Sequence, residues 1–316
     1  GWFRRRHGWQ IRPEWVLHTT GVIPALSAVI KALTQPGDKV LIQTPVYNHF
    51  FTSIHNSGCQ AAESPLVYRD NTYTIDFDDL ERKAADPAVK LMLLCNPHNP
   101  AGRVWTPAEL HRIGELCLRH DVVVVADEIH CELVMPGFSY TPFASLCEEF
   151  ERSSVTCTSP SKAFNLAGLQ VANIFAADAA LRARIGHSLQ INETGEIGPF
   201  AIEALIAAYD EGAEWLDALN EYLHDNYRFL REYFDRNLPQ YPVLPLEGTY
   251  LVWVDCRASG LTSDELETKL LEEAKLRINP GSIYGEAGRD FIRLNIACPR
   301  KLLAEGLDRL RKVLKR

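Results

Sequence analysis

Short, almost entirely apolar runs alternate with longer amphipathic stretches through the first part of the chain. The apolar runs have the length of strands and are rich in Val, Ile and Leu: KVLIQT (39–44), KLMLLC (90–95), VVVVAD (122–127), SVTCTS (154–159) and VANIFA (171–176). Strands without a polar face are covered on both sides, which is typical of parallel sheets. The stretches between them, at 23–33, near 47–57 and at 107–120, have helical periodicity. This alternation predicts an α/β fold with right-handed crossovers and a mostly parallel sheet flanked by helices.

The pattern changes after about residue 190. Residues 200–236 are largely helical, and a Pro-rich break at 238–248 follows them. We therefore expect a large domain over residues 1–200, and a long linking helix with a small C-terminal α+β domain over residues 201–316. The elements expected in the small domain are a strand at 250–255, a helix near 263–275, a strand at 291–297 and a last helix from about 301.

Charge and cysteine content disfavour several classes of function. The chain has 33 Lys and Arg against 41 Asp and Glu, and its net charge of −8 argues against binding to duplex phosphates. We interpret the one local basic run, Arg4-Arg5-Arg6-His7, as a solvated helix face. None of the eight cysteines forms a CxxC pair and the histidines show no HExxH spacing, so we expect no metal site. Free cysteines in apolar runs fit the reducing cytoplasm.

Other motifs and segments are also missing from the sequence. No apolar stretch approaches the ~18 residues that a membrane helix needs, so we expect no membrane partner. The sequence contains no Walker A loop, no GxGxxG after a strand and no GxSxG nucleophile elbow. The chain opens as GWFRRRHGWQ, without an initiator Met, and from this we expect that a leading segment is absent.

Polar or aromatic residues follow the ends of five predicted strands. Ligands of open α/β sheets bind beyond the carboxyl ends of the strands, so these residues are the candidates for chemistry. Any one of them is a weak signal, but their joint placement is hard to obtain by chance. They are Gly21 after VLHTT, Tyr47 after KVLIQT, Asn99 after KLMLLC, Asp127 at the end of VVVVAD and Lys162 after SVTCTS.

Lys162 is the most informative of these residues. It follows Ser159 and Ser161 at a strand end and has no acidic residue close to it in sequence. A lysine amine whose pKa is lowered by desolvation can attack a carbonyl carbon. From position alone, a surface lysine in a loop is the alternative.

Asp127 and Arg293 are charged residues in apolar strands. Asp127 follows four valines and an alanine, and a carboxylate buried there needs a partner. That partner is either a protonated ring nitrogen of a ligand, an internal Arg or a helix cap. Arg293 requires a carboxylate, from the protein or from a ligand. Strand alternation turns Glu128 to the opposite face, so we assign it no catalytic role.

Gly21, Val22 and Ile23 open a predicted helix. Its free N–H groups and its dipole favour a phosphate, to which the hydroxyls of Ser159 and Ser161 could add donors. Ordinary helix capping explains the same residues.

Tyr47 and Asn99 also have two interpretations each. The ring of Tyr47 could lie flat on a planar heterocycle, or it could be a packed core aromatic. Asn99 lies in an Asn-Pro turn, and turn chemistry alone could account for it.

Taken together, these segments resemble the fold-type I pyridoxal 5'-phosphate (PLP) enzymes, the aspartate aminotransferase superfamily. SPSKAFNLAG resembles the motif of the Schiff-base lysine, which implies that Lys162 carries the cofactor. The resemblance implies further roles at matching positions: Asn99 bonds the phenolic oxygen, Asp127 pairs with the pyridinium nitrogen, Tyr47 stacks on the ring, Gly21, Val22 and Ile23 cradle the phosphate, and Arg293 binds the substrate carboxylate.

Longer segments resemble one branch, the bacterial C–S lyases of the cystathionine β-lyase group. They are RRHGWQI, DEIHCEL, SPSKAFNLAGLQ, NETGEIGPFAIEALIAAY and INPGSIYGEAGRDFIRLNIACPR. Two positions depart from many aminotransferases, since Gln170 replaces an Arg that grips the phosphate and His130 replaces a Tyr. We count His130 among the residues that bind the cofactor. Family members begin several tens of residues earlier, with an arm that shapes the substrate entrance.

The resemblance implies β-elimination from an amino-acid thioether such as cystathionine, which gives a thiol, pyruvate and ammonia. It also implies a homodimer with its sites at the twofold interface. Two alternatives remain open: an aminotransferase, which shares the early steps, and a ligand-sensing domain of this fold without catalysis. We expect a small-molecule substrate and no nucleic-acid partner.

Overall fold

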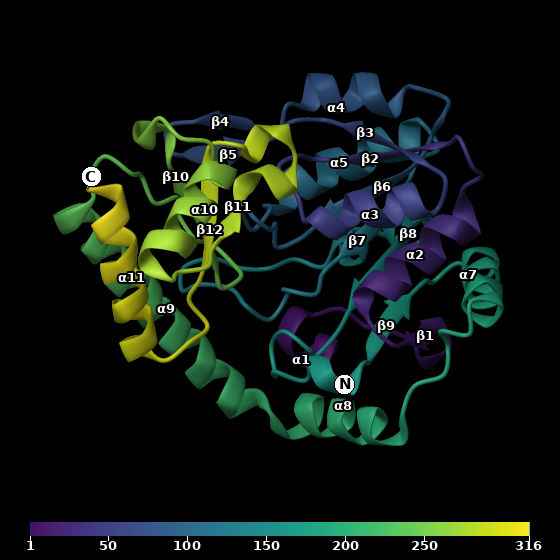
Figure 1. Cartoon of the computed structure of the whole chain (residues 1–316). Helices are drawn as coiled ribbons and strands as arrows, with labels where there is room; N and C mark the ends of the chain where they lie inside the picture. Colours follow the sequence, from purple (N-terminus) through teal and green to yellow (C-terminus); the bar gives the residue numbers. More distant parts are fainter. Residues whose placement is uncertain (316) are drawn as a thin grey trace.

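The computed structural model describes residues 1–315, and a seven-stranded sheet forms the centre of its larger part (Figure 1). In spatial order the strands are β1 (Val16–Thr19), β9 (Ala172–Phe175), β8 (Ser154–Thr158), β7 (Val123–Asp127), β6 (Val89–Cys95), β2 (Lys39–Ile42) and β3 (Gln60–Glu63). The strands from β3 to β8 run parallel, whereas β9 runs antiparallel to both of its neighbours. The predicted α/β class and the mostly parallel sheet are confirmed.

Helices cover both faces of this sheet, which explains why its strands have no polar side. Along β6, Leu91 and Leu93 pack into the core on one face, and Met92 and Leu94 into the core on the other. The helices on the first face are α2 (Val22–Leu33), α3 (Asn48–Asn56) and α7 (Ala179–Ile191). Those on the second face are α4 (Phe77–Ala84), α5 (Pro107–Arg119) and α6 (Glu148–Ser153).

A second core surrounds a three-stranded antiparallel sheet in the order β10-β12-β11. Its strands are β10 (Leu251–Asp255), β12 (Phe291–Asn295) and β11 (Asn279–Pro280), packed against α9 (Ala213–Asn237), α10 (Ser263–Ala274) and α11 (Arg300–Leu314). The strands and helices predicted for this half are present. Figure 1 shows α9 passing from the region of the large sheet to α11 beside the small sheet.

The predicted long linking helix is two helices. The first, α8 (Pro199–Glu211), ends at Gly212, where α9 begins. A Cβ atom at residue 212 would lie 2.4 Å from the carbonyl oxygen of Ala208 and 2.6 Å from the ring of Phe164. Only glycine permits this approach. Residues 200–236 are largely helical as expected, but they form two helices instead of one long linking helix.

The remaining elements are short. They are α1 (Trp2–His7), the hairpin strands β4 (Val67–Arg69) and β5 (Thr72–Thr74), and the 3-10 turns η1 (Pro13–Trp15), η2 (Phe143–Ser145), η3 (Ala167–Leu169), η4 (Arg257–Ser259), η5 (Gly281–Tyr284) and η6 (Glu286–Gly288). Within residues 1–315, no helix is long and apolar enough to span a bilayer.

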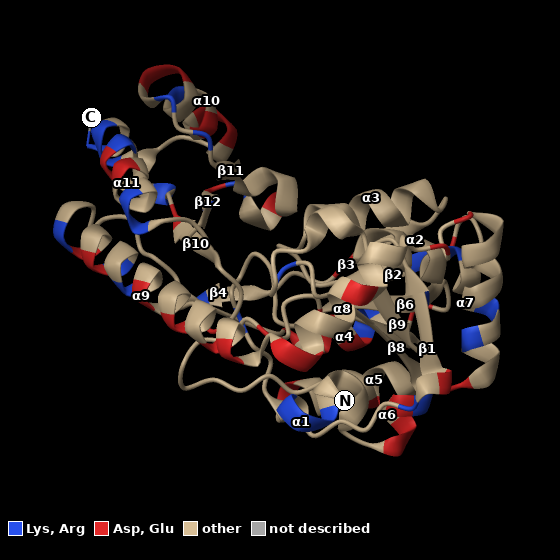
Figure 2. Ribbon diagram, turned by 90° about the horizontal axis from the view of Figure 1, so that it is seen from below, with Lys and Arg blue, Asp and Glu red and all other residues tan. Residues whose placement is uncertain are grey.

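Charged residues of both signs are spread over the outer helices. Figure 2 shows Lys and Arg interspersed with Asp and Glu along α9 and α11. In α1, Arg4, Arg5 and Arg6 are exposed as predicted, but His7 is turned inward and bonds to the buried Glu132. The interpretation of residues 4–7 as one solvated face is thus wrong for His7.

Candidate active site

A cavity of about 320 Å³ lies at the carboxyl ends of β6, β7 and β8 and reaches across to β10 and β12. Residues from both sheets line it, so it exists only where the two cores meet. Every residue that the sequence suggested for the site faces this cavity: Gly21, Val22, Ile23, Tyr47, Asn99, Asp127, His130, Ser159, Ser161, Lys162 and Arg293.

Asp127 is the last residue of β7 and is only 3% exposed. One oxygen accepts a hydrogen bond from the Ile129 N–H at 3.2 Å, and neither an Arg nor a helix cap among residues 1–315 reaches the carboxylate. Burial raises the pKa of this carboxyl to about 7, against smaller lowering effects of the Ile129 N–H and of the Lys162 charge. The protein therefore leaves this acid short of the cation that its burial requires.

Lys162 follows β8 and points into the same cavity as Asp127. Its side chain is half-buried, and its ammonium makes no salt bridge within the described part of the chain. The charge of Lys162 lowers the pKa of both Asp127 and His130. An amine without a protein partner at a pocket wall is available for covalent chemistry.

Arg293 enters the cavity from β12, on the opposite side from Lys162. Its Nη1 donates to Asn99 Oδ1 and its Nη2 to Asn279 Oδ1, both at 3.0 Å. The guanidinium lies over the ring of Tyr284, 4.9 Å from the centroid, and its Nε is buried without a partner. No carboxylate of residues 1–315 pairs with it, so the carboxylate expected for a buried Arg is not supplied by the protein.

Two aromatic side chains narrow the cavity. Burial raises the pKa of Tyr47 to about 12, with the negative charge of Asp127 adding to the effect. His130 is 4% exposed and its Nδ1 has no hydrogen-bond partner. Burial lowers the pKa of His130 to about 3, and the cations of Lys162 and Arg293 lower it further, so this ring is neutral near pH 7.

The start of α2 forms the end of the cavity nearest β1. Gly21 precedes the helix, and no side chain caps its first N–H groups. The hydroxyl of Ser159 lines the cavity but donates to the carbonyl of Val171 at 2.6 Å, so it is not free to donate to an anion there. Of the two hydroxyls expected to donate to the anion, only that of Ser161 is left, and it lines the cavity together with Val22 and Ile23.

Comparison with known proteins places this site in a family. Residues 1–310 match the model of the class I and II aminotransferases. The chain belongs to this family. Cystathionine beta-lyase PatB of Bacillus subtilis strain 168 is 43% identical over 314 residues, which are 99% of this chain and 81% of that protein.

Solved structures that are similar to this aminotransferase-family chain support the same assignment. Cystalysin of Treponema denticola, which contains a pyridoxal 5'-phosphate cofactor, matches with a TM-score of 0.97 at 37% identity, covering 99% of this chain and 80% of that chain. The PLP-bound C–S lyase of Staphylococcus hominis has a TM-score of 0.93 at 32% identity, covering 99% of this chain and 81% of that chain. Membership of the fold-type I superfamily, in its C–S lyase branch, is confirmed.

Several residues of this aminotransferase-family site were not predicted. Tyr250 and Asn295 line the cavity from the small sheet, and the ring of Tyr250 lies edge-on to His130 with centroids 5.8 Å apart. Both residues stand at strand ends, which was the only available signal. The sequence could not show which edge of the small sheet meets the large one. Cys95 and Ile129 also face the cavity.

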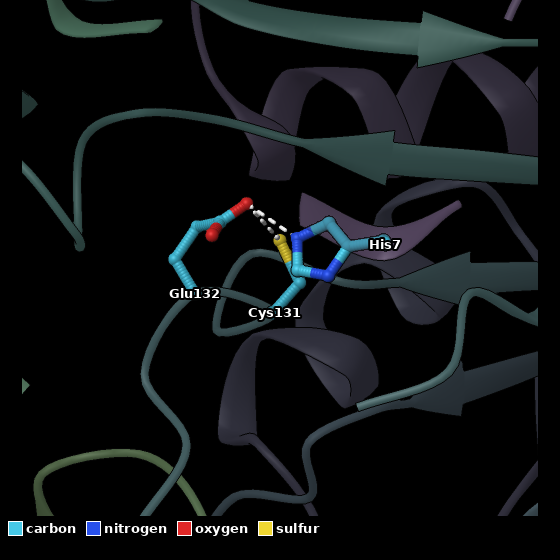
Figure 3. Close-up of side chains that lie close together, drawn as sticks. All are labelled: His7, Cys131 and Glu132. Atoms are coloured by element: carbon cyan, nitrogen blue, oxygen red, sulfur yellow. Dashed lines mark hydrogen bonds and ion pairs between the residues drawn. The ribbon is translucent and has the colours of Figure 1, made fainter. Parts of the chain in front are cut away.

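A second cluster of titratable groups lies outside the cavity (Figure 3). Glu132 Oε1 accepts hydrogen bonds from His7 Nε2 at 2.8 Å and from Trp2 Nε1 at 2.6 Å, and Cys131 Sγ donates to the same oxygen at 3.7 Å. These three partners account for the oxygen. His7, Cys131 and Glu132 offer three ligand atoms, one fewer than a closed tetrahedral zinc site uses.

Proposed function

We propose that this chain is a PLP-dependent C–S lyase that acts on amino-acid thioethers of the cystathionine type. The observation that carries the proposal is the set of three charged groups around one cavity. Asp127, Lys162 and Arg293 face one another across it, and none of them makes a salt bridge within residues 1–315. The relatives named above carry the same activity in their names.

The residues of the cavity fit PLP. Asp127 needs a cation, which a protonated pyridine nitrogen supplies, and the uncapped start of α2 suits a phosphate. Asn99 uses its carbonyl oxygen for Arg293, so its NH₂ group is left to donate to an oxygen of the ligand. Tyr47 supplies an aromatic ring beside the plane that the PLP ring would occupy between Asp127 and the start of α2. Gln170 lines this end of the cavity in place of an Arg, so the helix start carries the phosphate charge.

Each of these side chains has a distinct task in the reaction. PLP, when bound, supplies an aldehyde that joins to amines and a ring that accepts the electron pair left at the substrate Cα. Lys162 would be the residue that holds the aldehyde carbon of PLP and, when its amine is free, Nζ would take the Cα proton as a general base. Asp127 would keep the ring nitrogen protonated. Arg293 holds the substrate carboxylate, which fixes the Cα–H bond toward Lys162.

The overall reaction is a β-elimination followed by hydrolysis. The bond between Cβ and sulfur breaks, and sulfur leaves with the electron pair and gains a proton as the thiol. Cystathionine and one water thus give homocysteine, pyruvate and ammonia. His130 is neutral near pH 7 and accepts or donates a hydrogen bond through Nδ1 without adding charge beside Lys162.

The test is turnover of cystathionine by the PLP-loaded protein without any keto acid. We expect pyruvate and thiol in equal amounts, measured by a coupled lactate dehydrogenase assay and by thiol titration. An amino-group transfer enzyme would instead give product only after 2-oxoglutarate is added, and that result would overturn the proposal.

The attachment point is tested by borohydride reduction followed by peptide mapping. We expect the reduced adduct on Lys162, and the Lys162→Ala variant should lose the imine absorbance band together with roughly 100- to 10,000-fold of its activity. Lys301→Ala, on the exposed face of α11, is the matched control and should keep both. A Lys162→Ala variant with normal turnover contradicts the assigned role.

We further propose that residues 1–200 form the PLP-binding domain and that residues 201–316 form the smaller domain with its linking helices.

We also propose that the enzyme is a homodimer. Large apolar side chains gather on the helices beyond the cavity, where Phe200 is 79% and Ile191 68% exposed. Patches of this kind mark interfaces. Light scattering should give the mass of two chains for the wild type and a lower mass for the Phe200→Asp variant.

All eight cysteines are free, which supports a cytoplasmic setting.

A further inference from the structure

Asn279 touches the arginine that would hold the substrate carboxylate. It lies on β11 directly opposite Arg293 in the antiparallel pair of β11 and β12, so both side chains stand on the same face of the small sheet. Asn279 Oδ1 accepts a hydrogen bond from Arg293 Nη2 at 3.0 Å. This contact is separate from that of Asn99, which reaches Nη1 from the large sheet.

The guanidinium of Arg293 is fixed by neutral groups alone. A guanidinium has donors and no acceptor, so both asparagines must turn their carbonyl oxygens toward it. With the ring of Tyr284 beneath it and Nε without a partner, the fork is held in place while its charge stays uncompensated. A carboxylate that enters the cavity therefore meets an arginine that is already oriented and still fully charged.

We propose that Asn279 is a positioning residue that sets the specificity of the enzyme for α-carboxylates by holding the Arg293 fork without neutralising it. The proposal rests on the function proposed above. An aspartate at residue 279 would reach the same nitrogen but would satisfy the charge, and it would compete with the substrate. Asn279→Ala removes the contact that orients the fork, whereas the nearly isosteric Asn279→Asp adds a charge, so the two substitutions separate orientation from charge.

The kinetic test compares Asn279→Ala and Asn279→Asp with the wild-type holoenzyme. Loss of one hydrogen bond to the Arg293 fork should raise the KM for the thioether roughly 3- to 10-fold in Asn279→Ala, with kcat little changed. Asn279→Asp should raise KM by about tenfold or more, because its carboxylate occupies the fork. Asn279→Gln keeps the carbonyl oxygen and should recover part of the loss.

A control variant comes from the same region of the molecule. Asn237 ends α9 and donates from its side chain to the carbonyl of Tyr233, so Asn237→Ala removes a comparable hydrogen bond away from Arg293. Its KM should equal that of the wild type. Equal KM values for the wild type, Asn279→Ala and Asn279→Asp would overturn the proposal, as would a fall of kcat in Asn279→Ala at unchanged KM.

A binding measurement separates this proposal from the proposed function. The probe is 3-(methylthio)propionate, which has the thioether and the carboxylate but no amino group, with its neutral amide as the control ligand. By titration calorimetry, the wild-type holoenzyme should bind the acid and not the amide. Asn279→Ala should bind the acid several-fold more weakly, and Asn279→Asp should not bind it.

The outcomes are distinct. If the wild type does not discriminate acid from amide, the role of Arg293 and with it the proposed function fails. If the wild type discriminates but the two Asn279 variants bind the acid as tightly as it does, only the inference about Asn279 is wrong.

Discussion

One short segment, residues 127–132 at the end of β7, contributes to two buried polar clusters. The clusters differ in how far the protein itself satisfies their polar groups. Asp127 and His130 face the cavity, whereas Glu128, Cys131 and Glu132 face away from it. Glu128 is bonded by Tyr140 and by the Phe143 N–H at 2.9 Å, and Glu132 is bonded by Trp2 and His7. On the cavity side Asp127 accepts one N–H and His130 Nδ1 has no partner.

The difference shows how a binding site can be distinguished from a structural cluster of the same composition. Buried polar groups cost free energy unless they are hydrogen-bonded, so a fold that leaves several of them unsatisfied around one cavity has space for a ligand that completes them. The cluster of His7, Cys131 and Glu132 needs no ligand, because its members satisfy one another.

The largest expected effect is on catalysis by Asp127→Asn in the holoenzyme. Removing the charge opposite the ring nitrogen should lower kcat for pyruvate release roughly 100- to 1,000-fold, since electrostatic stabilisation of the developing charge is lost. His7→Ala, which breaks the other cluster, should leave kcat unchanged. Cofactor content is measured by absorbance in each variant, and a fully loaded Asp127→Asn enzyme with wild-type kcat would erase the contrast.

The second prediction concerns the stability of the protein without PLP. Burial raises the pKa of Asp127 from near 3.8 to about 7 in the folded state, so ionisation of this carboxyl is unfavourable in the fold. The penalty is absent below pH 4, grows as the pH rises, and is complete above pH 7. Asp127→Asn should therefore gain up to about 4 kcal/mol over the wild type at pH 8 and nothing at pH 4, measured by urea unfolding.

Asp255→Asn is the matched control for this pH series. Burial acts against ionisation there too, but the bonds from Arg257 outweigh it and lower the pKa of Asp255. That carboxylate stabilises the fold above its unfolded pKa and loses the effect in acid, so its variant should be less stable at neutral pH. Unfolding curves that shift in the same direction for both variants would contradict the assignment of Asp127 as an unpartnered acid.

The smallest effect is expected for the self-satisfied cluster. His7→Ala leaves the buried Glu132 carboxylate with fewer donors, which should cost about 1–3 kcal/mol of the free energy of unfolding. His111→Ala, at a half-exposed site on α5, should change it by less than about 0.5 kcal/mol. A His7→Ala protein that instead loses activity at full stability would show that the cluster acts on the cavity.

Much of the fold could be predicted from the sequence because it depends on local patterns. Continuous apolar runs such as that at 122–127 indicate strands covered on both faces, and the helical periodicity at 107–120 predicts a helix where the structure has α5. The break at Gly212 was not predicted, because the helical periodicity continues on both sides of it; the packing of the Phe164 ring against this glycine joins segments distant in sequence.

Local sequence patterns specify which residues stand at the carboxyl ends of the strands, because strand length and burial are encoded residue by residue. Lys162, Asp127 and Arg293 could therefore be named in advance as candidates for the site, and all three line one cavity. The tertiary structure was needed to show that Tyr250 and Asn295 line the same cavity, that Asn279 bonds to Arg293, and that the hydroxyl of Ser159 is already donated to Val171. These contacts form between two separate cores, and no local pattern specifies how the edges of two sheets meet.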